Sequence, residues 1–259
     1  MAATTPPALD PDLEQALKRL KLRAMRQLAP ELLVTAKTQR WAPEELLRTL
    51  VEAEIAARDA ANLANRLRAA SFPVVKTLEE FQLSASTIPP PTFDYLGSLE
   101  WIDADENVVL VGPPGTGKSH VLIALGHAAV HAGLRVRYLT AAELVERLFS
   151  GLADNTVGRT IDTLLRHHYV IVDELGFAPL DAVGSQLLFR FIAAAYERRA
   201  IGLASHHPFE NWGRFLPEQT TATAMLDRLL HHAIVVTTDG ESFRMREAKT
   251  RTTSRRKKT

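Results

Sequence analysis

Residues 107–119 read NVVLVGPPGTGKS, a short apolar run followed by a glycine-rich turn that ends in Lys-Ser. The turn matches the pattern G-x-x-x-x-G-K-[ST] at every fixed position. The apolar run is typical of a buried strand, and a helical pattern follows from about residue 118 to residue 131. Because this pattern binds phosphates when it joins a strand to a helix, we expect a phosphate-binding loop (P-loop) here.

The residues of this loop have separate tasks in binding a nucleoside triphosphate. Glycines allow the tight turn and direct backbone N–H groups inward, and the following helix adds its positive end. We expect Lys118 to act in catalysis at the β- and γ-phosphates and the Ser119 hydroxyl to bind Mg²⁺. The expected ATP-binding residues are Gly112, Pro113, Pro114, Gly115, Thr116, Gly117, Lys118 and Ser119.

A pair of acidic residues follows a second buried run, YVIVDE at 169–174. A P-loop protein needs a carboxylate at the end of a nearby strand to hold the magnesium ion. Asp173 is predicted to act on Mg²⁺ through its water, and Glu174 to polarise an attacking water as general base. The two adjacent carboxylates favour hydrolysis of the nucleotide over transfer of its phosphoryl group to a second substrate. The alternative is an ordinary surface turn after a strand.

The rest of the chain divides by pattern. Apolar runs separated by helical segments predict an α/β fold, in which a mainly parallel sheet of about five strands is sandwiched by helices. Ahead of it, helical spacing from about Leu13 predicts a first helix that Pro30 ends and a second that runs from Pro43 to about Ala70. The predicted domains are a helical N-terminal domain (1–81), a proline-rich linker (82–93), an ATPase domain (94–247) and a basic, disordered tail (248–259).

Composition narrows the function classes. The chain of 259 residues has no cysteine, which excludes disulfides, a thiol nucleophile and cysteine-ligated zinc. No long apolar run or secretory signal is present, so we expect a cytoplasmic protein without membrane contact. The net charge is only +1, but seven Lys and Arg residues crowd the stretch from Met245 onward. Such a tail either contacts nucleic acid or is a solvated segment.

Several stretches together resemble a known family. GPPGTGKS followed by VDE resembles the AAA+ ATPases, and four longer stretches resemble the IstB-like transposition helper ATPases, relatives of the DnaC helicase loaders. These are DELGFAPLD (173–181), HPFENWGRF (207–215), AMLDRLLHH (224–232) and GESFRMRE (240–247). The resemblance covers nearly the whole chain. It implies a P-loop AAA+ sheet preceded by a small all-helical N-terminal domain.

The resemblance also implies roles for single residues. Arg228 falls where such ATPases carry an arginine finger, which reaches the γ-phosphate of a neighbouring subunit and makes hydrolysis depend on a homo-oligomer. Arg244 falls at a second-sensor position, touching nucleotide in its own subunit. Each of these arginines can instead be an ordinary surface residue. Relatives read S-N-x-P-F where this chain has Ser205-His206-His207-Pro208-Phe209, so His206 takes the position that orients the attacking water. Alternatively, Ser205 does the sensing and His206 packs.

The implied function is an ATP- and Mg²⁺-dependent helper. It oligomerises on duplex DNA through mostly sequence-independent backbone contacts, presents that DNA to the transposase of the same element, and is reset by hydrolysis. The alternatives are a DnaC-like replicative helicase loader and an ATP-gated DNA-binding scaffold with little hydrolysis. Arg159 and Arg166 are weak candidates for DNA contacts, and an ordinary solvated helix face is the preferred explanation of both.

Three pairs of adjacent histidines also raise the question of a metal site. They are His167 with His168, His206 with His207, and His231 with His232. The first pair precedes a strand and the second follows one, so roughly 15 Å of strand separates them. The three pairs are therefore not expected to form one site.

Overall fold

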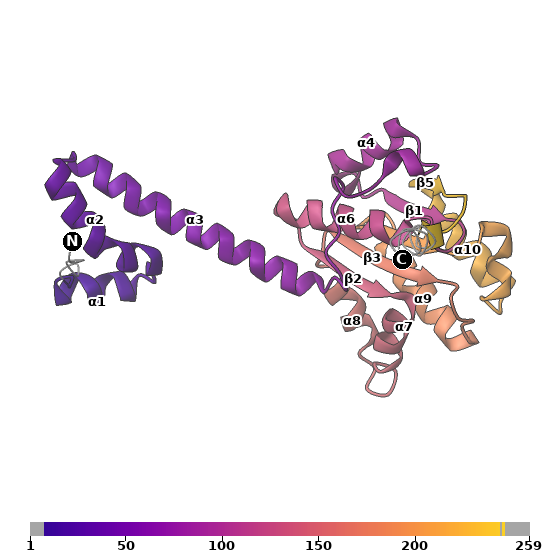
Figure 1. The fold of residues 1–259 in the computed structure, drawn as a ribbon. Coiled ribbons are helices and arrows are strands. Elements are labelled where there is room, and N and C mark those ends of the chain that lie inside the picture. The colour runs from indigo at the N-terminus through magenta and orange to yellow at the C-terminus, as the bar shows by residue number, and fades with distance from the viewer. Residues whose placement is uncertain (1–7, 244, 247–259) are drawn as a thin grey trace, which may run out of the picture. The chain divides into compact units, whose positions relative to one another are not determined.

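The computed structural model describes residues 8–243, 245 and 246, which belong to two compact units (Figure 1). The first unit extends to Asn65 and the second begins at Arg66, inside the long helix α3 (Pro43–Ala70). Arg244 and the basic tail 248–259 lie outside the described residues. The assignment of separate roles to residues 1–81, 82–93 and 94–247 stays a prediction.

The first unit is helical, with α1 (Pro11–Arg19), α2 (Arg23–Gln39) and the first part of α3. The expectation that Pro30 ends a helix is wrong, because α2 continues through it. A proline inside a helix removes one backbone hydrogen bond. Here Ala29 and Ala36 are both buried on α2, and this packing outweighs the local penalty.

A carboxylate from α3 caps the start of α2. The residue before α2 has no side-chain cap, and Glu54 Oε2 accepts hydrogen bonds from the backbone N–H groups of Ala24 (2.8 Å) and Met25 (3.1 Å). Arg58 Nε donates to Glu54 Oε1 at 3.0 Å. Burial raises the pKa of Glu54, but these hydrogen bonds outweigh it, so the pKa lies below its ordinary value.

The second unit is built around a five-stranded sheet in the order β2-β3-β4-β1-β5, with every neighbouring pair parallel. This confirms the predicted α/β class and strand number. The strands are β1 (Asn107–Val111), β2 (Val136–Thr140), β3 (Tyr169–Leu175), β4 (Ala200–Ser205) and β5 (Ala233–Thr237).

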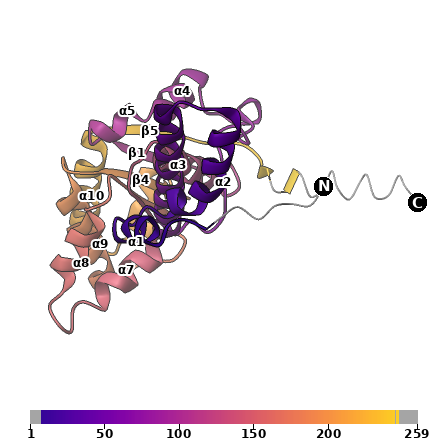
Figure 2. The ribbon, with the colours of Figure 1, turned by 90° about the vertical axis from the view of Figure 1, so that its left-hand side faces the viewer.

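Helices cover both faces of this sheet, as the prediction required. Helix α6 (Lys118–His131) packs on β2, β3 and β4, and α4 (Pro90–Ser98) and α5 (Glu100–Asp103) lie on the same side. The opposite face carries α7 (Ala141–Phe149), α8 (Val157–Leu164), α9 (Ala182–Ala195) and α10 (Gln219–His231) (Figures 1 and 2).

The hydrophobic core follows the alternation of the strands. Val109, Val172 and Leu203 face α7 to α10, where they join one cluster with residues such as Phe191 and Met225. Two 3-10 segments, Leu83–Ala85 and Phe209–Arg214, complete the described elements. None of the helices in the described part of the chain has the length and apolar character that a bilayer crossing needs.

Candidate functional site

The carboxyl ends of β1, β4 and β3 meet at one edge of the sheet. Val111 of β1 and Leu175 of β3 both pair with Ser205, the last residue of β4. The P-loop follows β1, the acidic pair ends β3, and His206 follows β4. Parallel topology therefore gathers three separate segments at this edge, which is where open α/β sheets bind their ligands.

The P-loop has a backbone that only glycine accommodates. Gly112, Gly115 and Gly117 have φ values of 144°, 81° and 96°. A Cβ atom on Gly112 would lie 2.0 Å from the Thr238 carbonyl oxygen, and one on Gly117 would lie 2.7 Å from Phe81 Cε2. The glycines thus allow both the left-handed turn and the close approach of Thr238 and Phe81.

Lys118 is held inside the loop. Its side chain is buried, and Nζ donates to the carbonyl oxygens of Gly112 (2.6 Å) and Pro113 (2.7 Å). Thr116 Oγ1 also donates to the Pro113 carbonyl at 2.9 Å and lies 2.7 Å from Thr238 Oγ1. A lysine ammonium at the centre of a glycine turn, at the start of α6, is an arrangement suited to binding phosphate.

The structure brings Ser119 and Asp173 into direct contact. Ser119 Oγ donates to Asp173 Oδ1 at 3.1 Å, although the two residues are 54 positions apart. Asp173 is buried and also accepts from the Glu174 N–H (2.8 Å) and from Tyr138 OH (2.9 Å). Hydroxyl and carboxylate oxygens are the hard ligands that Mg²⁺ prefers. Ser119 and Asp173 therefore fit a magnesium ion beside the P-loop.

Tyr138 fixes the orientation of this carboxylate. Burial raises the pKa of the Tyr138 phenol, and the negative charge of Asp173 raises it further. The phenol therefore stays protonated and remains a hydrogen-bond donor. A donor that orients a metal-binding carboxylate commonly matters almost as much as the ligand itself.

Glu174 is exposed beside the buried Asp173. It has a left-handed backbone, with φ of 60°, and lies in an irregularity of the β3–β4 pairing between Val172 and Leu175. Irregularities of this kind redirect a side chain and are frequent next to active sites. The local backbone thus presents one carboxylate of the pair to solvent while the other remains in the sheet.

His206 lies at the same edge and is also packed. Its ring is half-buried and meets Phe177 edge-on, with centroids 6.2 Å apart. The neighbouring His207 stacks on Phe215 at 5.8 Å, and the His207 N–H donates to Ser205 Oγ at 3.2 Å. Both readings of His206, as a water-orienting group and as a packing group, are compatible with this position.

The three candidate arginines that the structure describes do not gather at this edge. Arg228 is half-buried on α10, where Nη1 donates to the Ala224 carbonyl at 3.0 Å and the guanidinium lies 5.1 Å from the centre of the Phe189 ring on α9. Arg159 on α8 and Arg166 just after it are exposed. Arg166 precedes β3, and so lies toward the opposite edge of the sheet.

The residues missed by sequence reasoning are Tyr138, Thr238 and Phe81. Thr238 follows β5 and is buried against Gly112 and Thr116. Phe81 covers Gly117 and stacks on Phe93, with centroids 5.4 Å apart. Tyr138 lies in the middle of β2 and Thr238 directly after β5, and only the order of the strands shows that these two hydroxyl groups reach the site.

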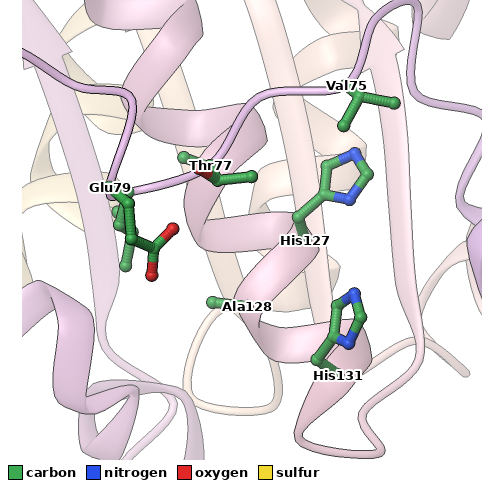
Figure 3. Close-up of a pocket in the computed structure, with 8 residues that line it drawn as sticks. Val75, Thr77, Glu79, His127, Ala128 and His131 are labelled. Atoms are coloured by element: carbon green, nitrogen blue, oxygen red, sulfur yellow. The ribbon is translucent and has the colours of Figure 1, made fainter.

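A separate cavity of about 330 Å³ lies beside the second half of α6 (Figure 3). It is lined by Val75, Thr77, Leu78 and Glu79 and, from α6, by Ala124, His127, Ala128 and His131. The His127 ring stacks on Phe72 at 4.4 Å, and burial is the main cause that lowers its pKa. Since Ala124 is six residues beyond Lys118, the cavity begins about 9 Å along the helix from the P-loop. It is distinct from the phosphate site.

Comparison of the sequence identifies close relatives. The model of the family described as "IstB-like ATP binding protein" matches residues 15–251. A protein of insertion sequence IS21 from Pseudomonas aeruginosa is 35% identical over 237 residues, which cover 91% of this chain and 89% of the relative. A protein of insertion sequence IS5376 from Geobacillus stearothermophilus is 34% identical over 230 residues, covering 88% and 92%. Both names include ATP binding.

Comparison of the fold points the same way. The structure of AMPPCP-bound DnaA from Aquifex aeolicus superposes with a TM-score of 0.52 and 20% identity, covering 69% of this chain and 55% of that one. The DnaC helicase loader superposes with a TM-score of 0.51 and 14% identity, covering 63% and 96%. At these identities the likeness establishes the AAA+ fold alone. With the family match, it shows that this chain belongs to the IstB-like ATP-binding proteins and has an AAA+ fold.

Proposed function

We propose that this protein is an ATP-hydrolysing, DNA-binding helper of transposition. It oligomerises on duplex DNA, prepares that DNA for the transposase of the same insertion sequence, and is reset by hydrolysis. The contact of Ser119 Oγ with Asp173 Oδ1 at 3.1 Å carries the catalytic part of this proposal, because it joins the P-loop to the acidic strand end. The insertion-sequence relatives support the biological part.

The residues at the sheet edge divide the work of hydrolysis. The loop N–H groups and Lys118 bind and orient the phosphates, while Ser119 and Asp173 hold magnesium, which supplies positive charge at the phosphate oxygens when bound. Tyr138 keeps Asp173 oriented. Glu174 accepts a proton from the attacking water, since its carboxylate is exposed beside Asp173. His206 donates a hydrogen bond that orients this water.

Arg228 completes the site of a neighbouring subunit. Its guanidinium is held against Phe189 of α9 by contacts within its own chain. A cation that is positioned before assembly loses little side-chain entropy when it reaches the γ-phosphate of another subunit. Hydrolysis in this proposal is therefore coupled to the oligomer that forms on DNA.

DNA binding is proposed to rest on backbone contacts from exposed cations, including Arg159 and Arg166. Phosphate contacts release counterions, so affinity for random duplex falls steeply as salt rises. Replacing each arginine with alanine should reduce the salt slope by about one unit per contact removed. A slope that is unchanged in the double variant would remove these two arginines from the interface.

Electron microscopy of the protein with ATP and duplex DNA tests the assembly. The proposal expects a closed or helical multimer along the duplex, and expects Lys118→Ala to abolish it because ATP is no longer held. The DnaC-like fold favours one rival function, a helicase loader. A chain that ignores duplex DNA but binds a hexameric replicative helicase would establish that rival instead.

A further inference from the structure

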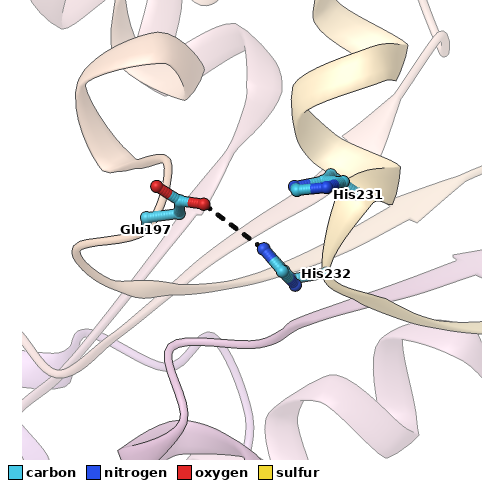
Figure 4. A group of neighbouring side chains, drawn as sticks. All are labelled: Glu197, His231 and His232. Carbon is cyan, nitrogen blue, oxygen red and sulfur yellow. Dashed lines mark hydrogen bonds and ion pairs between the residues drawn. The ribbon is translucent and has the colours of Figure 1, made fainter.

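Three side chains that commonly bind metals meet at the edge of the sheet opposite the P-loop. Glu197 lies in the turn before β4, while His231 ends α10 and His232 precedes β5. Each offers one ligand atom, and these atoms all lie within 4.8 Å of one another. Figure 4 shows both imidazole rings directed toward the Glu197 carboxylate. The three side chains are exposed, so an ion in solution can reach them.

The backbone beneath this group is anchored to the sheet. The Asn107 N–H donates to the His232 carbonyl at 2.7 Å, and Asn107 Nδ2 donates to the Leu229 carbonyl at 3.0 Å. Asn107 Oδ1 accepts from the Ile201 N–H at 3.0 Å, which ties the start of β4 to the same residue. The two segments that carry the ligands are therefore held in register by a single buried side chain.

A second contact orients one of the imidazoles. Tyr196 OH and His231 Nδ1 share a hydrogen bond of 2.7 Å, which leaves Nε2 of His231 as its ligand atom. Metal-binding histidines almost always have their other ring nitrogen engaged in this way, which fixes the tautomer and the ring orientation. The arrangement at His231 has this form before any ion is added.

The spacing between His232 and Glu197 suits a transition-metal ion. Two ligand atoms that each lie about 2.0–2.1 Å from a tetrahedral ion are about 3.3 Å apart. His232 Nε2 and Glu197 Oε1 are 3.3 Å apart. Two imidazoles and one carboxylate suit Zn²⁺, Ni²⁺ or Cu²⁺, whereas Mg²⁺ prefers an all-oxygen shell. The absence of cysteine from the chain leaves histidine as its principal ligand for such ions.

We propose that Glu197, His231 and His232 form a surface site for one divalent transition-metal ion, separate from the magnesium site at the P-loop. The ion bridges the end of α10 to the turn between α9 and β4, and solvent fills its remaining position. Because the bridge joins segments 34 residues apart, binding stabilises the folded chain over the unfolded one. The inference does not depend on ATP hydrolysis or DNA binding.

Calorimetric titration of the untagged, chelator-treated full chain with Zn²⁺ in excess Mg²⁺ tests the site. We expect one ion per chain in the wild type and an affinity for Zn²⁺ that is at least tenfold lower in His231→Ala and in Glu197→Gln. Zn²⁺ should raise the melting temperature of the wild type and of the control, but not of these two variants. The matched control is His168→Ala, which alters another adjacent histidine pair outside this group.

Two results would overturn the proposal. One is a wild-type chain whose Zn²⁺ binding is no tighter than that of His231→Ala. The other is an affinity for Zn²⁺ that falls as much in His168→Ala as in Glu197→Gln. Glu197→Gln keeps the shape of an exposed turn, so it remains folded even if His231→Ala perturbs the end of α10. Neither result would bear on the proposed hydrolysis, because no nucleotide is present.

Discussion

Replacing Tyr138 with phenylalanine perturbs the Asp173 carboxylate without altering the P-loop. The Tyr138 hydroxyl donates to Asp173 Oδ2 at 2.9 Å, and both side chains are buried. A hydrogen bond to a charged group contributes about 1.5–3 kcal/mol. If Tyr138 acts by orienting Asp173 for magnesium, the variant should need roughly 10–100 times more Mg²⁺ for half-maximal hydrolysis. Nucleotide binding without Mg²⁺ should be unchanged.

Tyr169 provides a matched control for this substitution. It is a fully buried tyrosine at the start of β3, and its hydroxyl has no hydrogen-bond partner among the described residues. Tyr169→Phe should therefore leave hydrolysis unchanged and raise the free energy of unfolding by about 1 kcal/mol. The assay is phosphate release against Mg²⁺ concentration, with thermal melts of each variant. Equal Mg²⁺ dependence in Tyr138→Phe and wild type would refute the reasoning.

Three further predictions concern the water-orienting position, the trans arginine and the helical unit. His206→Asn should keep ATP affinity and raise turnover, because the amide group always presents an N–H donor, whereas the tautomer of a neutral imidazole decides which of its two nitrogens donates. Equal turnover would make His206 a packing residue. Arg228→Ala should lower turnover by about 10³-fold or more. Adding Glu174→Gln subunits, which bind ATP without hydrolysing it and retain Arg228, should restore part of the turnover in a phosphate-release assay. The pKa of Glu54 is lowered, so the ionised carboxylate stabilises the fold above pH 4.5, the ordinary pKa, and this effect is lost as the pH falls through the lowered pKa. Glu54→Gln should therefore melt at a lower temperature than wild type near neutral pH. This difference in melting temperature, followed by circular dichroism, should shrink in acid.

The parts of the site that sequence reasoning could predict depend on local or topological rules. The P-loop pattern lies within eight consecutive residues, and its positive φ values follow from the glycines. The meeting of Ser119 with Asp173 follows from parallel topology, because the carboxyl ends of parallel strands share one edge. Neither inference needs the order of the strands within the sheet.

The parts that could not be predicted depend on tertiary packing. Tyr138 reaches Asp173 only because β2 lies beside β3, with Thr140 paired to Asp173. Pro30 stays within a helix because burial of neighbouring alanines outweighs a local signal. The three histidine pairs were expected not to form one site. Glu197, whose carboxylate lies beside His231 and His232, comes 34 residues before His231, where no spacing rule could place it.

Phosphate release by the wild-type chain and by Glu174→Gln, each with and without duplex DNA, tests the central claim most directly. The glutamine keeps the size of the side chain but cannot accept the proton of the attacking water. We predict that wild type releases phosphate, that duplex DNA stimulates it, and that Glu174→Gln binds ATP without releasing phosphate. Nucleotide binding without phosphate release from wild type under either condition would contradict the account and leave an ATP-gated scaffold.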